Sequence, residues 1–529
     1  MSCWSSRLTV AWGDFRVALR CHGGKLRRDV NQVSVKPSVK EFAELSKAGN
    51  VVPVYAQLAA DFETPVSAFL KLRDGGHAFL FESAESTDAS GRWSIVGSQP
   101  RWVFTSRGDE VTITRGGTSE TRPREGDVLE ELERLMAGYR PVSHGNAPPF
   151  FGGAVGYVGY DAAQQFEPSI MECPPDDLGL PEAVFFLADT LVVFDHKLRR
   201  LLVVANAMLD EAGSVEDAYA QAVGRVGAVL EMLDRPLHVA PLNGLAEVKA
   251  PEPRSNTTQA EYEEMVLQAK DYIAAGDAFQ VVPSQRFEAD FDGSNIDLYR
   301  ALRHINPSPY MFVYETPEFS LVGSSPEVHV RAIDGRIDIR PIAGTRWRGK
   351  TREEDDALAA DLLADEKECA EHVMLIDLAR NDVGRISEPG SVTVDDQMIV
   401  ERYSHVMHIV SNVSGRLSPE HSSYDVLRST FPAGTVSGAP KIRAMQIINS
   451  LEKNKRGTYS GAVGYFGWDG NHDSCIALRT CLLKGDKVYI QAGAGVVADS
   501  DPSYEYRETV NKAAAMMRAV GLAKTLAKP

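Results

Sequence analysis

Two acidic residues, Glu368 and Glu371, stand three positions apart in the stretch DEKECAEHVML, which reads as a helix. Residues with this spacing lie on one face of a helix. The same stripe continues through Leu375 and Leu378, which are core residues by type and spacing, so we expect both carboxylates to point inward. Two inward-pointing like charges are costly unless a cation joins them.

A second acidic pair near the C-terminus repeats this spacing. Glu505 and Glu508 lie at the start of a helix expected in DPSYEYRETVNKAAAMM. Mg²⁺ prefers oxygen ligands, usually keeps several waters, and takes one or two carboxylates directly. Two solvated helix faces would show the same spacing. A cation shared by the two pairs is therefore a hypothesis that needs a second signal.

Three glycine-containing turns could supply backbone N–H groups to an anion. They are QAGAGVV with Gly493, Ala494 and Gly495, FPAGTVSGAPK with Thr435, and PIAGTRW with Gly344 and Thr345. Further side chains that could bind or move charge are Tyr459, Arg479, His408 and Lys512, the last of which lies one turn beyond Glu508. Cationic groups beside acidic pairs favour a carboxylate ligand bridged by Mg²⁺.

The elements that must position these residues fall into two regions. Residues 39–235 alternate apolar strands with amphipathic helices and predict an N-terminal α/β region, in which residues 183–208 are expected to form a hairpin of two long strands. The proline-rich stretch 236–256 reads as a linker. A capped helix then opens a second region, residues 257–525, which again alternates strands with helices.

One short motif occurs in both regions. GAVGYVGYD, residues 153–161, recurs as GAVGYFGWD, residues 461–469. Both are apolar strands in which regularly spaced glycines permit another backbone to approach closely. We expect the two strands to have similar roles in the two halves of the fold.

Composition limits the class of partner. The chain has 529 residues, with 56 Lys and Arg against 73 Asp and Glu and a formal net charge of -17, which argues against nucleic acid or an anionic membrane as the main partner. No apolar run reaches the ~18 residues that a membrane span needs. The six cysteines are scattered without zinc-ligand spacing, which indicates reduced thiols in a cytoplasmic protein. Residues 1–36 are strongly basic, and we interpret them as a disordered or mis-started leader.

The order of motifs along the chain resembles one family. Between residues 258 and 520 the sequence contains, in order, NPSPYMF, GSSPE, PIAGTR, EKECAEHVMLIDLARND, RYSHVMHIVS, FPAGTVSGAPK, YSGAVGYFG, CIALRT, QAGAGVV and EYRETVNKA. This run is similar to the catalytic domain of the chorismate-binding enzymes, and the chain from about residue 40 resembles the anthranilate synthase component I group of that family. The resemblance implies an α+β fold in which large antiparallel sheets form a sandwich flanked by helices, with a regulatory N-terminal region and a chorismate-binding domain at residues 257–525.

The resemblance also implies roles for the matching residues. Mg²⁺ would join the ring carboxylate of chorismate to Glu371 and Glu508 directly and to Glu368 and Glu505 through water. Substrate-binding positions would be Gly344, Thr345, Tyr459, Arg479, Gly493, Ala494, Gly495 and Lys512. Catalytic positions would be Glu327, which resembles the acid that protonates the departing C4 hydroxyl, together with His408, Thr435 and Gln280.

Two positions separate the activities found within the family. Isochorismate and salicylate synthases carry a lysine base where this chain has Gln280, and an amide cannot deprotonate water. Aminodeoxychorismate synthases commonly carry a lysine nucleophile where this chain has Ala343. The resemblance therefore favours direct attack of ammonia on chorismate to give anthranilate and pyruvate, the first committed step of tryptophan biosynthesis. Aminodeoxychorismate synthase component I and a non-catalytic tryptophan sensor that binds the amidotransferase are the alternatives.

The source of ammonia and a regulator are also implied. No cysteine of the chain lies in a G-x-C-x-G elbow, so we expect no glutaminase activity. The resemblance implies a separate glutamine amidotransferase subunit, component II, in an α₂β₂ assembly. Ser83 of LFES, which carries Phe81 where the family has leucine, resembles one wall of a pocket for the inhibitor tryptophan. Pro309, Tyr310 and Met311 resemble the other wall.

Overall fold

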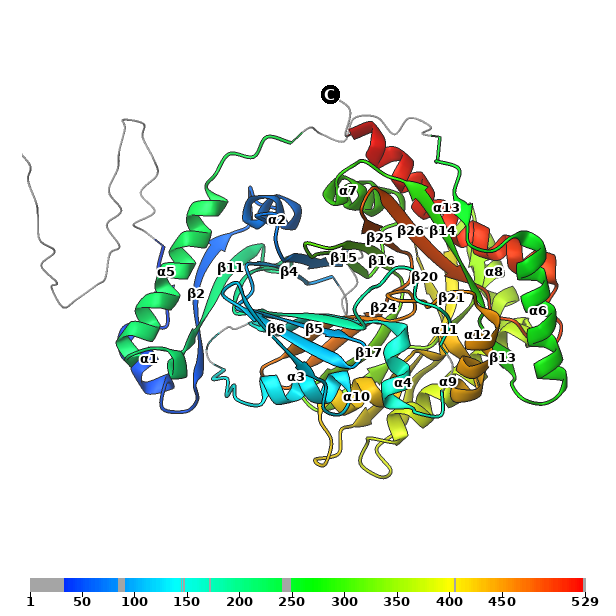
Figure 1. The fold of residues 1–529 in the computed structure, drawn as a ribbon, viewed down its shortest axis with the longest axis horizontal. Helices are drawn as coiled ribbons and strands as arrows, with labels where there is room; N and C mark the ends of the chain where they lie inside the picture. Colours follow the sequence, from blue (N-terminus) through cyan, green and yellow to red (C-terminus); the bar gives the residue numbers. More distant parts are fainter. Residues whose placement is uncertain are drawn as a thin grey trace, which may run out of the picture.

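The structure, a computed structural model, describes residues 33–83, 91–143, 145, 148–170, 173–239, 249–403 and 406–526. Within them the chain forms two large β-sheets of twelve strands each (Figure 1). A separate two-stranded ladder joins β13 (Gln280–Val281) to β22 (Gly438–Ala439). The expected α+β architecture of large antiparallel sheets is confirmed.

The first sheet is antiparallel throughout its named strands. In spatial order its strands are β1 (Val35–Lys36), β2 (Val51–Ala59), β11 (Arg200–Met208), β10 (Thr190–Asp195), β4 (Trp93–Ser98), β3 (Ala78–Glu82), β15 (Tyr310–Glu315), β16 (Ser320–Ser325), β25 (Thr480–Lys484), β26 (Lys487–Gly493), β14 (Ser284–Asp290) and β12 (Arg254–Ser255).

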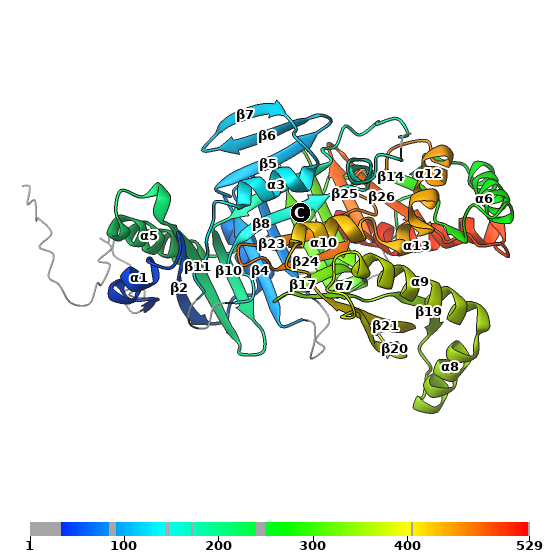
Figure 2. The same ribbon diagram turned by 90° about the horizontal axis from the view of Figure 1, so that it is seen from below.

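The second sheet is also antiparallel. Its strands in spatial order are β19 (Ile342–Trp347), β21 (Val406–Arg416), β18 (Arg336–Ile339), β17 (Val328–Ile333), β24 (His472–Ile476), β23 (Ala462–Gly467), β8 (Gly153–Val158), β9 (Ala183–Ala188), β5 (Trp102–Arg107), β6 (Glu110–Arg115) and β7 (Thr118–Pro123), with β20 (Thr393–Arg402) paired to β21. Figure 2 shows β5 to β7 projecting at one end of this sheet and β20 and β21 at the other.

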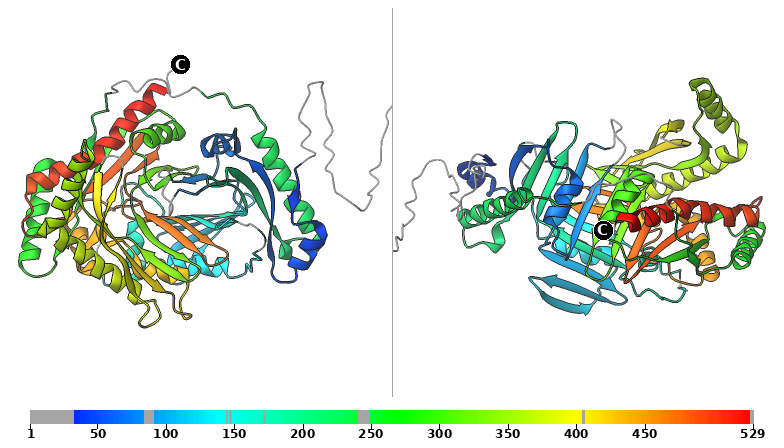
Figure 3. Two further views of the ribbon diagram at one scale, coloured as in Figure 1. Left: turned by 180° about the vertical axis from the view of Figure 1, so that it is seen from behind. Right: turned by 90° about the horizontal axis from the view of Figure 1, so that it is seen from above.

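The two halves of the sequence share both sheets. In the first sheet β3 of the N-terminal half pairs with β15 of the C-terminal half, with Glu82 opposite Met311. In the second sheet β8 pairs with β23, and Figure 3 shows the orange C-terminal strands beside the cyan N-terminal ones. Between the sheets Phe186 stacks on Tyr314 with ring centroids 4.3 Å apart, as expected for the interior of a sandwich.

The repeated glycine motif explains how the halves join. The two copies pair with each other, and Gly156 lies opposite Gly464. Across this join, a Cβ atom at Gly153 would lie 2.1 Å from the carbonyl oxygen of Phe466, and one at Gly461 would lie 2.2 Å from that of Val158. Because backbone cannot move away as a side chain can, these positions require glycine. The prediction of similar strand roles is confirmed, and the strands are direct neighbours.

The helices cover the outer faces of the sandwich. Helices α2, α5, α7 and α13 pack on the first sheet and contribute to one core, whereas α3, α9 and α10 contribute to the core on the second sheet. Their bounds are α1 (Val39–Leu45), α2 (Pro65–Leu72), α3 (Val128–Met136), α4 (Ala163–Phe166), α5 (Val215–Leu233), α6 (Gln259–Ala274), α7 (Asn295–Ile305), α8 (Arg352–Ala364), α9 (Glu366–Gly384), α10 (Ser423–Thr430), α11 (Gly434–Ser437), α12 (Lys441–Leu451) and α13 (Pro502–Leu526).

The prediction for residues 183–208 is wrong in one respect. β10 and β11 do form a hairpin, but β9 belongs to the other sheet, so the apolar run before the hairpin is two strands rather than one. The chain crosses between the sheets at Asp189, which is buried and forms an ion pair of 2.9 Å with Arg101. The Asp189 carbonyl accepts a hydrogen bond of 2.8 Å from the backbone N–H of Asn206. These partners compensate for the buried polar groups at the crossing.

Several sequence expectations concern the ends and linkers of the regions. The basic leader lies outside the described residues as far as residue 32, and Val35 and Lys36 pair with β2. Residues 240–248 of the proposed linker also lie outside them. The domain boundaries stay predictions. The four cysteines in the described part of the chain are free thiols, and no helix in that part is long and apolar enough to cross a membrane.

Candidate active site

A cavity of about 1000 Å³ lies beside the two acidic helices α9 and α13. Its walls also come from β19, β21 and the loops around Glu327, Thr435, Tyr459 and Arg479. The cavity brings together most residues that the sequence singled out: Gln280, Glu327, Gly344, Thr345, Glu368, Glu371, His408, Thr435, Tyr459, Arg479, Gly493, Gly495, Glu505, Glu508 and Lys512. Ala494 does not line it, because its side chain is fully buried and its N–H donates to the Pro283 carbonyl over 3.2 Å.

The first acidic pair faces the cavity from α9. The helix begins after Asp365, whose carboxylate accepts hydrogen bonds from the N–H groups of Lys367 and Glu368. Glu371 Oε1 accepts a hydrogen bond of 2.9 Å from the Gln280 amide. Burial raises the pKa of Glu368, and the nearby charge of Glu371 raises it further. The fold therefore places the two carboxyl groups close enough for the charge of Glu371 to disfavour ionisation of Glu368.

The second acidic pair faces the same cavity from α13. Glu505 is 6% exposed, and burial raises the pKa of its carboxyl, to which the charge of Glu508 adds. Glu508 pairs with Lys512 over 2.5 Å, and the same ammonium donates to the Gly493 carbonyl over 3.0 Å. Among the described residues no three His, Cys, Asp or Glu side chains are gathered into a formed metal centre. Two carboxylate pairs lining one cavity are nevertheless the donor chemistry that a hard divalent cation takes, so they fit Mg²⁺.

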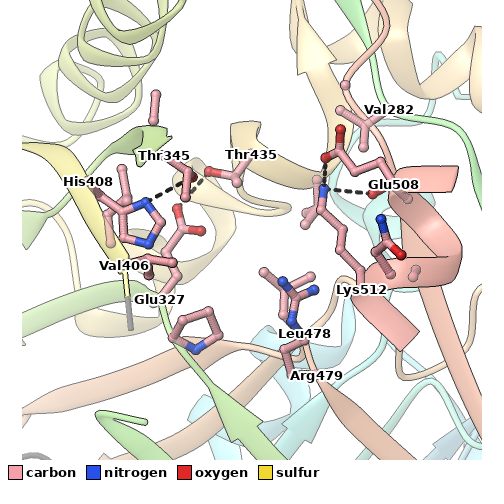
Figure 4. A pocket seen from close by; sticks show the side chains of 18 of the residues that line it. Val282, Glu327, Thr345, Val406, His408, Thr435, Leu478, Arg479, Glu508 and Lys512 are labelled. Carbon is pink, nitrogen blue, oxygen red and sulfur yellow. Dashed lines mark hydrogen bonds and ion pairs between the residues drawn. The ribbon is translucent and has the colours of Figure 1, made fainter. Parts of the chain in front are cut away.

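Glu327 and Thr435 are hydrogen-bonded to each other in another part of the cavity wall. Glu327 is 7% exposed, and its Oε1 accepts a hydrogen bond of 2.6 Å from the Thr435 hydroxyl (Figure 4). Burial raises the pKa of the carboxyl to about 7, although the hydrogen bond from Thr435 acts in the opposite direction. A carboxyl with this pKa is protonated in a large fraction of molecules near neutral pH and can act as a general acid.

His408 on β21 is oriented by the neighbouring strand. Its Nδ1 lies 2.9 Å from the Gly344 carbonyl and 3.1 Å from the Thr345 hydroxyl. Because a carbonyl oxygen only accepts, Nδ1 carries the proton, which leaves Nε2 as an acceptor in the neutral ring. Burial lowers the His408 pKa and favours that neutral form. Gly344 has φ +68° at a bulge in the β19 ladder, a backbone conformation that suits glycine.

Arg479 contributes a cationic side chain to the cavity wall. Its guanidinium forms no hydrogen bond or ion pair with another described residue, and burial lowers its pKa. Figure 4 places it between the Glu327 group and the Glu508–Lys512 pair in this view. Tyr459 lines the cavity nearby and is 8% exposed. A planar guanidinium that is desolvated and unpaired fits a carboxylate ligand.

The chain was compared with known proteins. A model of the chorismate-binding enzymes, described as "chorismate binding enzyme", matches residues 76–518. The chain belongs to the chorismate-binding enzyme family. It is 47% identical over 491 residues to anthranilate synthase component 1 of Pseudomonas aeruginosa, a match that covers 92% of this chain and 99% of the relative. The corresponding protein of Cereibacter sphaeroides is 48% identical, with 91% and 97% covered.

Solved structures of the family agree. The crystal structure of anthranilate synthase component I from Streptococcus pneumoniae matches with a TM-score of 0.71 at 39% identity and covers 87% of this chain and 99% of that one. The menaquinone-specific isochorismate synthase of Escherichia coli matches with a TM-score of 0.67 at 18% identity, covers 91% and 99%, and shares the fold. The resemblance to chorismate-binding enzymes inferred from the motifs is confirmed.

The residues expected to bind the inhibitor tryptophan lie beside one another, and most of them lie outside the large cavity. Ser83 directly follows β3, which pairs with β15 and its Tyr310 and Met311. Met311 is buried in the core, and Tyr310 donates a hydrogen bond of 2.9 Å to Asp473. Pro309 is the member of the set that lines the large cavity. The tryptophan site stays a prediction.

Sequence reasoning missed several residues of the cavity wall. Asn511, Ala515 and Arg518 line it from α13, and Lys367 and Arg507 add charge near the acidic pairs. Asn511, Ala515 and Arg518 follow Glu508 at steps of three or four residues. They therefore lie on the same face of α13 as the acidic pair, and the same spacing could have predicted them. Lys367 lies four residues before Glu371 on α9, so helical spacing also places it beside the first acidic pair.

Proposed function

We propose that this chain is the large subunit of an anthranilate synthase. It converts chorismate and ammonia into anthranilate, pyruvate and water, and thereby commits chorismate to tryptophan. The observation that carries the proposal is the composition of the cavity wall: the amide of Gln280 and the methyl group of Ala343 occupy the two positions where a lysine would serve as a base or a nucleophile. Ammonia needs neither group, because it is already a nucleophile.

The cavity residues divide the work of binding. The Arg479 guanidinium takes one carboxylate of chorismate, and the backbone of Gly493 and Gly495 together with Gly344, Thr345 and Tyr459 holds the substrate in register. Glu371 and Glu508 would hold Mg²⁺ directly, and Glu368 and Glu505 would hold it through water. When bound, the ion supplies positive charge for the ring carboxylate. Lys512 adds positive charge beside Glu508.

The proton roles follow from burial and hydrogen bonding. Ammonia adds to C2 of the ring, the C4 hydroxyl leaves as water with a proton from Glu327, and loss of the enolpyruvyl group as pyruvate makes the ring aromatic. Thr435 fixes the acid through its 2.6 Å hydrogen bond. The neutral His408 presents its Nε2 acceptor toward the reacting ring.

The proposal includes a partner and a regulator. Because the sequence lacks a glutaminase elbow, ammonia comes from glutamine through a separate amidotransferase subunit, component II, in an α₂β₂ assembly in the cytoplasm. Tryptophan binds between Ser83 and the Pro309–Met311 segment and inhibits the reaction. The pairing of β3 with β15 supports this, because it brings the two segments together.

The test is anthranilate fluorescence from the purified chain supplied with chorismate, Mg²⁺ and an ammonium salt at mildly alkaline pH. We expect product that disappears with EDTA, falls with tryptophan, and is not formed from glutamine unless the amidotransferase is added. Consumption of chorismate without anthranilate would identify an aminodeoxychorismate synthase instead. No consumption at all would leave the non-catalytic sensor.

A further inference from the structure

A second buried arginine lies behind the cavity wall. The side chain of Arg456 is 1% exposed and is not among the residues that line the cavity. The guanidinium of Arg479, which lines the cavity, has no hydrogen-bond partner among the described residues. Arg456 is the opposite case, because each of its three guanidinium nitrogens has an acceptor. The two arginines lie on either side of Tyr459 in the sequence. The guanidinium of Arg456 is bonded within the protein, whereas that of Arg479 faces the cavity.

The partner acid of Arg456 is Glu452. Nε of Arg456 donates to Glu452 Oε2 over 3.0 Å, and Nη2 donates to Oε1 over 2.5 Å, so the pair is bidentate. Glu452 Oε1 also accepts hydrogen bonds of 2.8 Å from both the N–H and the hydroxyl of Ser284. The ion pair thus fixes the start of β14 as well as the end of α12.

The remaining donors of Arg456 hold two segments of the cavity wall. Nη1 donates to the carbonyl of Val436 over 2.8 Å, and Nη2 donates to the carbonyl of Val282 over 2.6 Å. Both valines line the cavity. Val436 directly follows Thr435, the hydroxyl donor to Glu327, and Val282 lies two residues after Gln280. One guanidinium therefore bonds two neighbouring backbone segments of the cavity wall, which also pair with each other through β13 and β22.

Aromatic rings enclose the same guanidinium. Its central carbon lies 4.5 Å from the centroid of the Tyr160 ring and 5.6 Å from that of Tyr459. Tyr459 lines the cavity, whereas Tyr160 comes from the N-terminal half and belongs to the repeated glycine motif. The N–H of Tyr160 donates to the Gly457 carbonyl over 2.9 Å, next to Arg456 in the chain. Cation–π contact with a desolvated guanidinium is strong.

We propose that the Arg456–Glu452 ion pair is a positioning unit that sets the relative places of three parts of the cavity wall: the segment Gln280–Val282, the segment Thr435–Val436, and the ring of Tyr459. Stability alone is a poor explanation for such a pair, because well-packed apolar residues often replace a buried ion pair without loss. An apolar side chain could not bond two carbonyls and a carboxylate at once. Turnover therefore depends on the planar shape of the guanidinium, which directs its N–H donors toward several acceptors at once, and not only on its charge.

The test compares Arg456→Lys with a matched control, Arg443→Lys. Arg443 lies on α12, pairs with Asp277 over 2.9 Å and stacks on Tyr272, but it is 40% exposed and does not line the cavity. Melting temperature, the chorismate dissociation constant by calorimetry, and kcat per folded molecule are measured for both variants. Lysine keeps the charge but cannot bond the carboxylate and both carbonyls in the same planar arrangement. At temperatures well below its melting temperature, we therefore expect Arg456→Lys to lower kcat/KM by about tenfold to a hundredfold. We expect Arg443→Lys to match the wild type.

The turnover measurement rests on the proposed function. The outcomes nevertheless distinguish a failure of this inference from a failure of that function. An Arg456→Lys variant that melts earlier but turns over and binds chorismate like the wild type would overturn the positioning role. If the lysine variant does not fold, Tyr160→Leu removes one aromatic wall without leaving a buried charge unpaired, and an unchanged kcat/KM in that variant would likewise overturn it. A wild-type chain that makes no anthranilate would overturn the proposed function instead, and the chorismate dissociation constants would then decide the positioning role.

Discussion

The Thr435 hydroxyl donates a 2.6 Å hydrogen bond to Glu327, and the two residues come from segments more than a hundred positions apart in the chain. Glu327 lies between β16 and β17, whereas Thr435 lies in the four-residue helix α11. The carboxyl is buried, with a pKa of about 7. Burial favours the protonated acid and the hydrogen bond favours the carboxylate, so the balance between them sets the pH range of turnover.

That balance predicts how turnover depends on pH. At a constant concentration of free ammonia, kcat/KM should fall as pH rises through about 7, because the general acid loses its proton. Thr435→Val removes a hydrogen bond that stabilises the carboxylate, so the pKa of Glu327 should rise and the falling limb should move upward by about one pH unit. A pH–rate profile of each variant checks this. Thr435→Ser keeps the hydroxyl and is the control. A limb that stays in place in Thr435→Val would remove Glu327 from the proton transfer.

Arg479 should control the affinity for chorismate. Replacing its unpaired guanidinium with methionine should raise the KM for chorismate by about tenfold to a hundredfold, because a charge-assisted hydrogen bond contributes roughly 1.5 to 3 kcal/mol. Arg479→Lys should recover part of this loss, since charge is retained without the bidentate fork. The KM for ammonium should change little. Equal losses for both substrates would indicate general damage to the cavity instead.

The two acidic pairs should control the metal requirement. Glu371→Gln and Glu508→Gln each remove a carboxylate charge from the cavity, and we expect each to raise the free Mg²⁺ concentration for half-maximal activity by about tenfold or more. Mn²⁺ binding followed by electron paramagnetic resonance gives a readout that does not depend on turnover. Glu366→Gln, an exposed residue at the start of the same helix α9, is the control and should leave both values unchanged. Equal metal binding in all three variants would contradict the assignment.

The close packing of β8 against β9 predicts a stability difference between two glycines. Gly156→Ala places a Cβ atom 2.0 Å from the Val184 carbonyl oxygen, and we expect it to lower the free energy of unfolding by about 2 kcal/mol or more. Gly224→Ala on α5 meets no atom within 4 Å and should raise it by about 0.5 to 1 kcal/mol, since alanine favours a helix. Urea denaturation measures both. Similar effects at the two sites would mean that the backbones of β8 and β9 can separate enough to admit a methyl group.

Local spacing predicted the parts of the site that lie on single helices. The pairs Glu368 and Glu371, and Glu505 and Glu508, follow from the three-residue step on a helix face, and they line one cavity as expected. The split at Asp189 did not follow, because AVFFLADTLVVF is apolar on both sides of the crossing and reads as one strand. The sheet that each half joins is decided by strand partners distant in the sequence, which are β5 and β8 for β9, and β4 for β10.

The Arg456–Glu452 pair shows a second limit of local patterns. In the sequence it is an acid and a base four residues apart, which is the ordinary pattern of an exposed pair on a helix. In the structure α12 ends at Leu451, and both side chains are buried by Tyr160, Val282 and Ser284, which come from two other places in the chain. Only tertiary packing separates a buried pair from a solvated one with the same spacing.

The most direct test of the chemistry assigned to this cavity is the variant Glu327→Gln. The amide keeps the shape of the side chain and can accept the hydrogen bond from Thr435, but it cannot deliver a proton. We expect it to bind chorismate with a dissociation constant within about threefold of the wild-type value, while the rate of anthranilate formation falls by about a hundredfold or more. A Glu327→Gln enzyme that forms anthranilate at the wild-type rate would contradict the account.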